Sequence, residues 1–563
     1  MQEVVLSIEK AIKYLFDLEV AVELTLTDEQ FGDYATNIAM RLSKKLGQNP
    51  REIAQQIVEQ LKDDKIERAE IAGPGFINIT VKSGALAMML NQEINKSPHD
   101  EYGASEIGSG RTVVCEFPSP NMAKPFSVGH IRSALQGWAI YKLMRLHGYS
   151  VITDNHLGDS GTPFGKWVVG FQRYSSDDKL DQGGINELAR VYIVITAEMK
   201  EENSAGKSTI ADEVQQWLQR LEAQDPEAIK FSERFNKISL DHMHKVMARL
   251  NIQTELELGE SFYVTRGQEM VDELIEKGVA KSSEGAVIVE LDELGINTPV
   301  MLRKANGTAL YATTDLATIE YREKHWSPER VFIHTGEEQN FYFRQLNGLS
   351  QKAGFKPVIQ HLWHGLVDQK VEDGGREKMS SRKGVVLLQD LLDYAEEEAR
   401  KHNKDGSDES IKAVALGAIK FADFTADRKN GVLFDWENMF SVQGFSGPAV
   451  QYSAVRINSI LDKAGVVDSV NFSTYDWKDE KRLLVQVLHY PILLRELHDS
   501  YEMHKLSGYL YDLARSFNRY YEEHRIITAP EPEKSAKLWT ITQVRMVLVH
   551  GLDILGIPTP EKM

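Results

Sequence analysis

Two short stretches carry residue types suited to chemistry on a phosphate. The first is Ser127-Val128-Gly129-His130, which stands between a proline-rich turn and a long helical pattern. The start of a helix offers free backbone N–H groups and the positive end of the helix dipole, and glycine allows a close approach, so the position suits a nucleotide phosphate. Taken alone, a glycine–histidine pair is more often a plain capping turn with a surface histidine.

The second stretch is KMSSRKG, residues 378–384. Lys378, Arg382 and Lys383 supply cations, and Ser380 and Ser381 supply hydroxyls. A glycine-flanked loop of this kind can close over a triphosphate and stabilise charge that develops only in the transition state. An ordinary solvated basic loop has the same composition. The occurrence of both stretches, in this order, favours a nucleotide-dependent reaction over a plain capping turn and an ordinary solvated loop.

The elements around the first stretch form one βαβ pattern. Val113–Phe117 is a short apolar run typical of a buried strand, and apolar residues then recur at helical spacing from Ile131 to Leu146. Gly148 fits the left-handed position that ends a helix, and a second apolar strand follows at Ser150–Thr153. A βαβ unit predicts a parallel sheet with a ligand crevice at the carboxyl ends of its strands. Because the dinucleotide-binding glycine fingerprint is missing, a dehydrogenase is disfavoured.

Composition narrows the class of protein. At 563 residues the chain should hold three or more domains, and it has no apolar run long enough to span a bilayer. The N-terminal residues have helical periodicity and acidic side chains, unlike a targeting peptide. A net charge of −18 argues against non-specific binding of nucleic acid. The single cysteine, Cys115, excludes an internal disulfide and a multi-cysteine zinc site, and it suits the reducing cytoplasm.

The chain divides into three predicted domains. Residues 1–108 have the pattern of a small α/β module, with helices at Val4–Phe16 and Pro50–Leu61. Residues 109–440 hold the βαβ unit, a mostly helical insertion at about 170–305, a hairpin signal at Asn306-Gly307, and a buried strand within 330–339 that leads into polar residues. From 408 onward the pattern is almost wholly helical, broken near 444–448 and 529–532, with the last domain at 441–563.

The two stretches resemble the HIGH and KMSKS signatures of class I aminoacyl-tRNA synthetases. Their surroundings, CEFPSPNMAKPFSVGHIRSA, NHLGDSGTPFGK, ALYATTDLA, FDWENMFSVQGFSGPAVQYSAVRI and IPTPEKM, resemble the arginyl-tRNA synthetase family in particular, along nearly the whole chain. The resemblance implies a Rossmann-type catalytic domain with an inserted connective segment, a small N-terminal α/β domain that contacts tRNA, and an all-α anticodon-binding bundle.

The implied activity is that of an arginine–tRNA ligase in protein synthesis. L-arginine and ATP, the latter with Mg²⁺, give arginyl-adenylate, and the arginine then passes to the 3′ end of tRNA(Arg). Chemistry of this kind depends on positioning and charge stabilisation. The resemblance also implies that tRNA binding precedes activation of arginine, and that the protein is a monomer. The single cysteine and the lack of a long apolar run lead us to expect a cytoplasmic protein with neither a structural zinc nor a membrane attachment.

The resemblance assigns site residues by their place in the motifs. Those implied for the amino acid, whose guanidinium needs carboxylates and neutral acceptors, are Glu116, Ser119, Asn121, Tyr311, Asp315 and Gln339. Those implied for ATP are Ser127, Gly129, His130, Lys378, Met379, Ser380, Ser381 and Arg382. Catalysis is assigned to Lys124, His130, Lys378, Ser380 and Arg382. Outside the family, a pair such as Tyr311 and Asp315 would more often be a surface hydrogen bond.

One position departs from the pattern. Ser127 replaces the first histidine of the HIGH signature, and a serine can donate a hydrogen bond to phosphate but cannot carry an imidazolium charge. We expect His130, Lys124 and the loop at 378–382 to share the phosphate charge. In the C-terminal part, Tyr452, Arg456, Arg515 and Arg519 are expected to bind tRNA, with Tyr509, Tyr520 and Tyr521 as candidate stacking platforms. Core packing is an equally good account of each single aromatic residue.

Three other functions share some of these features. Another class I synthetase would share both signatures, although the single cysteine excludes a multi-cysteine zinc site and the insertion is too short and helical for an editing domain. A nucleotidyltransferase that does not use tRNA would have no need of the long helical C-terminal part. An inactive paralogue that binds tRNA or partners is favoured only by Ser127. Pyrophosphate exchange with arginine, with and without tRNA, separates them.

Overall fold

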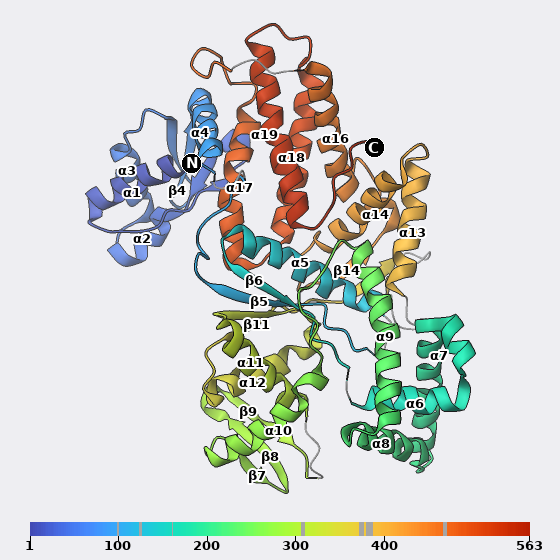
Figure 1. The fold of residues 1–563 in the computed structure, drawn as a ribbon. Helices are drawn as coiled ribbons and strands as arrows, with labels where there is room; N and C mark the ends of the chain where they lie inside the picture. The colour runs from blue at the N-terminus through green and yellow to red at the C-terminus, as the bar shows by residue number, and fades with distance from the viewer. Residues whose placement is uncertain are drawn as a thin grey trace. The chain divides into compact units, whose positions relative to one another are not determined.

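The computed structural model describes residues 1–97, 101–122, 126–159, 161–305, 310–370, 376–378, 387–465 and 470–563, with the backbone alone at 222, 369–370 and 376–378. The chain forms two compact units (Figure 1). One contains residues 1–105, 441–553 and 559–563, and the other contains 106–440 and 554–558.

A parallel sheet lies at the centre of the second unit. Its strands are β5 (Thr112–Glu116), β6 (Ser150–Asp154), β10 (Arg330–Ile333) and β11 (Val358–His361), in the order β11-β10-β5-β6. Val114 pairs with Ile152 on one side and with Val331 on the other. Val113, Val114 and Cys115 are buried, as a strand covered on both faces requires. The predicted βαβ unit and its parallel sheet are confirmed.

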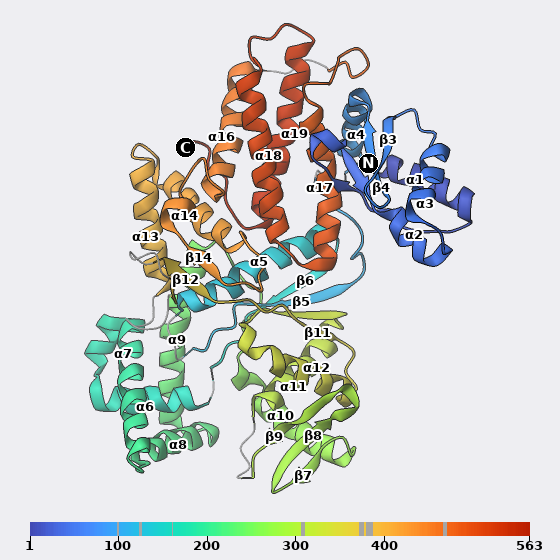
Figure 2. The same ribbon diagram turned by 180° about the vertical axis from the view of Figure 1, so that it is seen from behind.

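Helix α5 (Ile131–Leu146) covers one face of this sheet, and α11 (Tyr311–Trp326) and α12 (Asn340–Ala353) lie on the other (Figures 1 and 2). Gly148 has φ +83°, as predicted for the end of α5. A Cβ atom at Gly137 would lie 2.4 Å from the ring of Phe117, so only glycine lets α5 pack this closely on the chain that leaves β5.

A buried ion pair fixes the first turn of α5. The Nε of Arg132 donates to Oδ1 of Asp423 at 2.6 Å, and Nε2 of Gln136 donates to the other carboxylate oxygen at 2.6 Å. Asp423 ends helix α14 (Asp408–Asp423), and both Arg132 and Asp423 are almost fully buried. Because removing one partner would leave a buried charge unpaired, this pair fixes the register of α5 just after His130.

The insertion is helical only in its first part. It contains α6 (Thr162–Tyr174), α7 (Asp177–Ser204), α8 (Thr209–Glu222), α9 (Pro226–Arg249) and α10 (Glu260–Glu276). The strands β7 (Lys281–Ser283), β8 (Ala286–Leu291) and β9 (Ile296–Arg303) then form an antiparallel sheet. Helices thus make up most of residues 170–305, as predicted, and the sheet at 281–303 is the exception. Alternating apolar residues of β8 and β9, such as Val289 and Leu302, are buried against the core beneath α11 and α12.

The hairpin predicted from Asn306-Gly307 is wrong. Residues 306–309 lie outside the described part, but β9 pairs with β8, and the chain from Tyr311 is the helix α11. The hydroxyl of Thr313 donates to the carbonyl of Leu302 at 2.7 Å, in the first turn of that helix. Tyr311 and Asp315 therefore lie one turn apart on a helix.

The remaining elements of this unit are short helices, short strands and two further helices. They are the short helices η3 (Val128–His130) and η5 (Glu337–Gln339), strands β12 (Val367–Lys370), β13 (Arg376–Lys378) and β14 (Val432–Phe434), and helices α13 (Leu388–His402) and α15 (Trp436–Met439). Strand β14 interrupts the stretch predicted to be almost wholly helical, and it pairs in parallel with β12.

In the other unit, an α/β module of residues 1–97 folds with a group of long helices. The module has α1 (Gln2–Phe16), α2 (Ile38–Leu46), α3 (Pro50–Gln60) and α4 (Ser83–Lys96) against an antiparallel sheet of β1 (Thr25–Leu26), β2 (Tyr34–Thr36), β4 (Phe76–Val81) and β3 (Ile66–Ala72). Helix α3 begins at Pro50 as predicted, with Asn49 capping it.

The helical part of this unit contains α16 (Gly447–Ala464), α17 (Lys481–Ser500), α18 (His504–Glu523) and α19 (Glu533–Ile554). The breaks predicted near 444–448 and 529–532 are confirmed, because α16 starts after the cap Ser446 and α19 starts after Pro532. The hydroxyl of Tyr34 donates to the carbonyl of Val485 at 2.8 Å and joins the module to α17. None of the helices described has the length and apolarity needed to cross a bilayer.

Candidate active site

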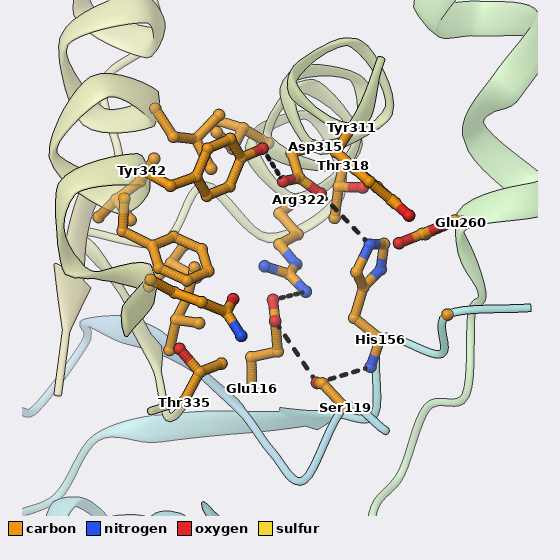
Figure 3. Close-up of a pocket in the computed structure, with 18 of the residues that line it drawn as sticks. Glu116, Ser119, His156, Glu260, Tyr311, Asp315, Thr318, Arg322, Thr335 and Tyr342 are labelled. Atoms are coloured by element: carbon orange, nitrogen blue, oxygen red, sulfur yellow. Dashed lines mark hydrogen bonds and ion pairs between the residues drawn. The ribbon is translucent and has the colours of Figure 1, made fainter. Parts of the chain in front are cut away.

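A cavity of about 420 Å³ opens at the carboxyl ends of β5, β6 and β10, where a parallel sheet binds its ligands. All six residues predicted for the amino acid line it, from segments as far apart as 116 and 339 (Figure 3). The lining also includes Val331, Ile333 and Ile359 from the strands and Phe343 and Leu346 from α12. The cavity is therefore apolar on one side and carries its charged groups on the other.

The chain leaving β5 places three polar residues on the cavity. Glu116 ends the strand, and Ser119 has φ +50° with its N–H donating to the Asn155 side chain at 3.1 Å. The Ser119 hydroxyl lies 3.4 Å from Oε1 of Glu116 and accepts a hydrogen bond from the backbone N–H of His156 at 3.2 Å. Asn121 forms an isolated parallel bridge with Gly158, so the turns after β5 and β6 hold each other in place.

One face of α11 supplies the opposite wall. Tyr311, Asp315, Thr318 and Arg322 follow each other at intervals of four, three and four residues, and all four line the cavity. At 3.6 residues per turn this spacing keeps them on one face of the helix. The sequence analysis used only the first two, and the same interval carried two turns further would have found Thr318 and Arg322.

Arg322 neutralises the carboxylate that ends β5. Its Nη2 lies 2.7 Å from Oε2 of Glu116 and 2.7 Å from Oδ2 of Asp154, which ends β6. All three side chains are buried. Burial opposes the charge of Arg322, but the two carboxylates outweigh it and raise the pKa of the guanidinium. Glu116 thus offers mainly its other oxygen, Oε1, to a ligand.

Asp315 lies at the centre of the charged wall. The hydroxyl of Tyr342 on α12 donates to its Oδ2, and Nε2 of His156 lies 3.5 Å from its Oδ1 (Figure 3). Burial, together with the adjacent Asp315, raises the pKa of Tyr342 well above its usual value, so this hydroxyl stays a donor. Burial lowers the pKa of His156, but Asp315 and Glu116 overcome that effect and bring it to about 9.

The predicted phosphate residues form a helix start near the same sheet edge, outside this cavity. Ser127 caps η3, and η3 runs directly into α5. The N–H of Ser127 donates to Nδ1 of His130 at 3.2 Å, and the ring of His130 stacks on Phe126 at 5.4 Å between centroids. Since Nδ1 accepts, the proton of the neutral imidazole is on Nε2.

The remaining residues predicted for ATP and catalysis lie outside the described side chains. Lys124, Met379, Ser380, Ser381 and Arg382 are not among the described residues, and Lys378 is described only as the last backbone position of β13. There it pairs with Asp368 of β12. The roles predicted for these residues stay predictions.

In the other unit, the predicted tRNA residues separate into two kinds. The guanidinium of Arg456 lies over the rings of Tyr452 and Tyr521, 4.7 Å and 5.3 Å from their centroids, and the three side chains are partly or fully exposed. Tyr509 and Tyr520 are instead buried. Their hydroxyls donate to the carbonyl of Gln486 and the carboxylate of Glu480, so packing in the helical core excludes them as stacking platforms.

The two remaining arginines lie on α18. The guanidinium of Arg515 lies 5.7 Å from the ring centroid of Tyr511. Arg519 is exposed and lies 3.6 Å from Oε1 of Glu29 in the α/β module. An exposed pair at this distance contributes little to stability, so the pair does not prevent Arg519 from meeting a phosphate.

His156, Arg322 and Tyr342 were missed by the sequence analysis. His156 stands in the quoted motif NHLGDSGTPFGK, three residues after the strand predicted at Ser150–Thr153, and that position was its only signal. Tyr342 lies three residues after Gln339 at the start of α12. Among the residues described, no group of three or more histidine, cysteine, aspartate or glutamate side chains is arranged to hold a metal ion.

Three family models match consecutive parts of the chain. They are the class I (R) tRNA synthetase catalytic domain at residues 96–436, the DALR anticodon binding domain at 450–563, and the arginyl tRNA synthetase N terminal domain at 2–81. Together the three matches account for nearly all of the chain.

Curated relatives match over almost their whole length. The arginine–tRNA ligase of Streptococcus thermophilus is 34% identical over 537 residues, 93% of each chain, and that of Clostridium botulinum is 33% identical over 571 residues, 99% of each. The arginyl-tRNA synthetase structure from Thermus thermophilus has a TM-score of 0.84 at 23% identity over all of both chains, and that from Plasmodium falciparum has 0.79 at 21% over 100% of this chain and 99% of the other. The catalytic, N-terminal and anticodon-binding models all match, and the curated relatives exceed 30% identity over nearly the full length. The chain therefore belongs to the arginyl-tRNA synthetase family.

Proposed function

We propose that this chain charges tRNA(Arg) with L-arginine in two steps. In the first, a carboxylate oxygen of arginine attacks the α-phosphorus of ATP, which enters as its magnesium complex, and pyrophosphate leaves. In the second, a hydroxyl of the terminal ribose of tRNA attacks the carbonyl carbon of arginyl-adenylate, and AMP leaves. The single observation that carries the proposal is the gathering of Glu116, Asp315, Tyr311 and Gln339 on one cavity at the sheet edge.

The charges of the cavity fit a cationic amino acid. Asp315 and Glu260 line it with Glu116, whereas Arg322 offsets only the pair of carboxylates at the strand ends. A guanidinium presents donors in a rigid fork, and a carboxylate flanked by a tyrosine hydroxyl can accept from it in the plane of that fork. The strand-end group of Ser119 and Asn121 is then suited to the backbone ammonium and carboxylate of the substrate.

The helix start at Ser127–His130 is suited to the phosphates. A protonated Nε2 on His130 can donate to a phosphate oxygen, and the α5 N-terminus adds its dipole. We assign Lys124, Lys378, Ser380 and Arg382 to the charge that develops as pyrophosphate departs, following their place in the motifs. No metal other than the magnesium that accompanies ATP is required by this scheme.

The helical part of the other unit is proposed to bind the anticodon, and the N-terminal module the tRNA elbow. Arg456 between two tyrosine rings offers both a cation and flat surfaces for unpaired bases. The protein is proposed to act as a monomer in the cytoplasm, where charged tRNA is used.

Exchange of radiolabelled pyrophosphate into ATP tests the proposal. We expect exchange that depends on L-arginine and on tRNA(Arg), and formation of arginyl-tRNA. L-citrulline replaces the guanidinium by a neutral urea of nearly the same shape, so it should not support exchange. Exchange with citrulline as efficient as with arginine would show that the carboxylates do not select the substrate. Binding of tRNA without any exchange would favour an inactive paralogue.

A further inference from the structure

His156 is placed where a substrate cation is expected. Its Nε2 lies 3.5 Å from Oδ1 of Asp315, and the ring packs beside Tyr263 of α10 at 5.7 Å between centroids. The side chain is nine-tenths buried, and within the described structure neither ring nitrogen has a hydrogen-bond partner. A buried imidazole with unsatisfied nitrogens that faces a carboxylate across a cavity is poised to change partner.

The groups that face His156 are mainly acidic. Glu116 and Asp315 favour the imidazolium form, and Arg322 on the same helix as Asp315 opposes it. Figure 3 shows Glu260 of α10 pointing toward the same ring from the far side. Tyr263 and Tyr342 carry the other titratable side chains near it, and the raised pKa of each keeps its hydroxyl neutral. The empty cavity therefore holds a protonated His156 at neutral pH, since its pKa is about 9.

The guanidinium of a bound substrate would compete with the imidazolium of His156 for the carboxylate of Asp315. Tyr342 donates to Oδ2 of Asp315, so on this carboxylate Oδ1 is the acceptor that His156 and a ligand guanidinium share. Two cations a few ångströms apart in a buried pocket repel each other strongly. The proton on the weaker base, the imidazole, is the one that can leave.

We propose that His156 couples arginine binding to proton release in the amino-acid pocket. Its imidazolium pairs with Asp315 before arginine binds, and binding of arginine releases the imidazolium proton to solvent. This inference rests on the proposed function, because it takes arginine as the occupant. His156 is a positioning residue here, which holds Asp315 in place and does not touch the reacting atoms. Neutral His156 can then accept a hydrogen bond from the bound guanidinium.

The linkage has a defined sign. A proton released on binding makes the affinity for arginine rise with pH while His156 is protonated in the free protein. The KM for arginine should fall by up to about tenfold per pH unit from about pH 6.5 to 8.5 and level off near pH 9. The kcat at saturating arginine should change much less, because His156 is neutral in the occupied pocket.

Calorimetry gives a direct count of protons. Arginine is titrated, without ATP, into the protein saturated with tRNA(Arg), at pH 7.5 in two buffers of very different ionisation enthalpy. We expect close to one proton released per site in the wild type and close to none in His156→Gln, with the same contrast in the pH profile of KM. His402→Gln, a change of an exposed histidine on α13, should release as many protons as the wild type.

Each other outcome has a distinct meaning. Arginine binding with no proton release, or with equal release in wild type and His156→Gln, would overturn the inference, the second because the proton would then come from the α-ammonium of arginine. No arginine binding and no charging by the wild type would instead refute the proposed function. If His156→Gln fails to fold, His156→Asn and the wild-type proton count still decide the question.

Discussion

Ser127 and His130 hold each other across the first turn that leads into α5. The N–H of Ser127 donates to Nδ1 of His130 at 3.2 Å, and the Ser127 hydroxyl lies 3.3 Å from the same nitrogen. Together with the bond from the helix backbone to the Ser127 side chain, this is a capping box in which histidine takes the place of glutamate. Ser127, which replaces the first histidine of the HIGH pattern, therefore has a structural role of its own: it orients His130, the second histidine of that pattern.

This arrangement predicts that the departure is tolerated. The wild-type protein should form arginyl-tRNA, and Ser127→His should change the rate by about tenfold or less, because a charged hydrogen bond typically exceeds a neutral one by about 1 kcal/mol. His130→Ala should be much more damaging. Ser127→Ala, which removes the cap, should cost about 1 kcal/mol of stability in thermal or urea unfolding. A wild-type protein inactive in pyrophosphate exchange but rescued by Ser127→His would refute this account.

Asp315→Asn should impair the use of arginine far more than the use of ATP. The carboxylate accepts from Tyr342 and pairs with His156, and its loss leaves the substrate guanidinium without its anion. Breaking a desolvated ion pair costs about 3–5 kcal/mol, which corresponds to a rise in the arginine KM of at least about a hundredfold. Glu323→Gln, on the same helix and outside the cavity, is the matched control. An arginine KM within a few-fold of the wild type would remove Asp315 from the pocket.

Lys378→Ala and Arg382→Ala should slow formation of the adenylate and leave tRNA affinity nearly intact. We expect the charge of both side chains to act where pyrophosphate departs, and loss of one transition-state donor costs about 10²–10³ in rate. Single-turnover activation and a tRNA binding assay measure the two effects separately. A fall in tRNA binding with unchanged activation would make the loop a nucleic-acid contact instead.

Arg456→Ala should weaken tRNA binding and make the affinity for tRNA less dependent on salt concentration. The guanidinium is held over two tyrosine rings and also donates to the side chain of Asn518 at 3.1 Å, so it is preorganised for a phosphate. Loss of one phosphate contact should lower the slope of log affinity against log salt by about one. Arg190→Ala on α7 makes the same change in net charge and controls for it. An unchanged salt slope would mean that Arg456 only packs between the rings.

Glu480 should make stability depend on pH. It is fully buried at the start of α17, and its Oε1 accepts from Tyr520 at 2.6 Å and from Tyr475 at 3.2 Å. Burial raises its pKa in the folded state, although the Tyr520 hydroxyl partly offsets that effect. A raised folded-state pKa means that the folded protein binds the proton more tightly, so its contribution to stability is greatest below the unfolded pKa of about 4.3 and is lost as pH rises through the folded value.

Glu480→Gln keeps an acceptor for the two tyrosines and removes the charge. The difference in Tm between this variant and the wild type should therefore shift in favour of the variant as pH rises from about 4 to 8. Glu522→Gln changes an exposed carboxylate on α18 and should show no such trend. A constant difference in Tm across this range would show that Glu480 titrates as it does in the unfolded chain.

Local sequence was enough to specify the elements on which the site is built. The apolar run before Glu116, the helical spacing after His130 and the glycine at 148 predicted β5, α5 and its end, because each depends on residues close together in the chain. The six residues that the family resemblance assigned to the amino acid also line one cavity. Local sequence was misleading at 306–307, where the pair that predicted a hairpin precedes a helix. It was also misleading at 281–303, where short alternating segments in a mostly helical insertion form strands.

Only the tertiary structure decided which charges meet. Arg322 is 206 residues from Glu116 and 168 from Asp154, yet it pairs with both, and His156 reaches Asp315 across the cavity. No periodicity contains that information, because the pairing is set by how α11 packs beside the ends of β5 and β6. The same reason governs Tyr509, Tyr520 and Tyr521: all three lie on α18, and packing of the helices buries the first two and leaves the third exposed. Spacing along a helix fixes which residues share a face, whereas burial depends on what that face packs against.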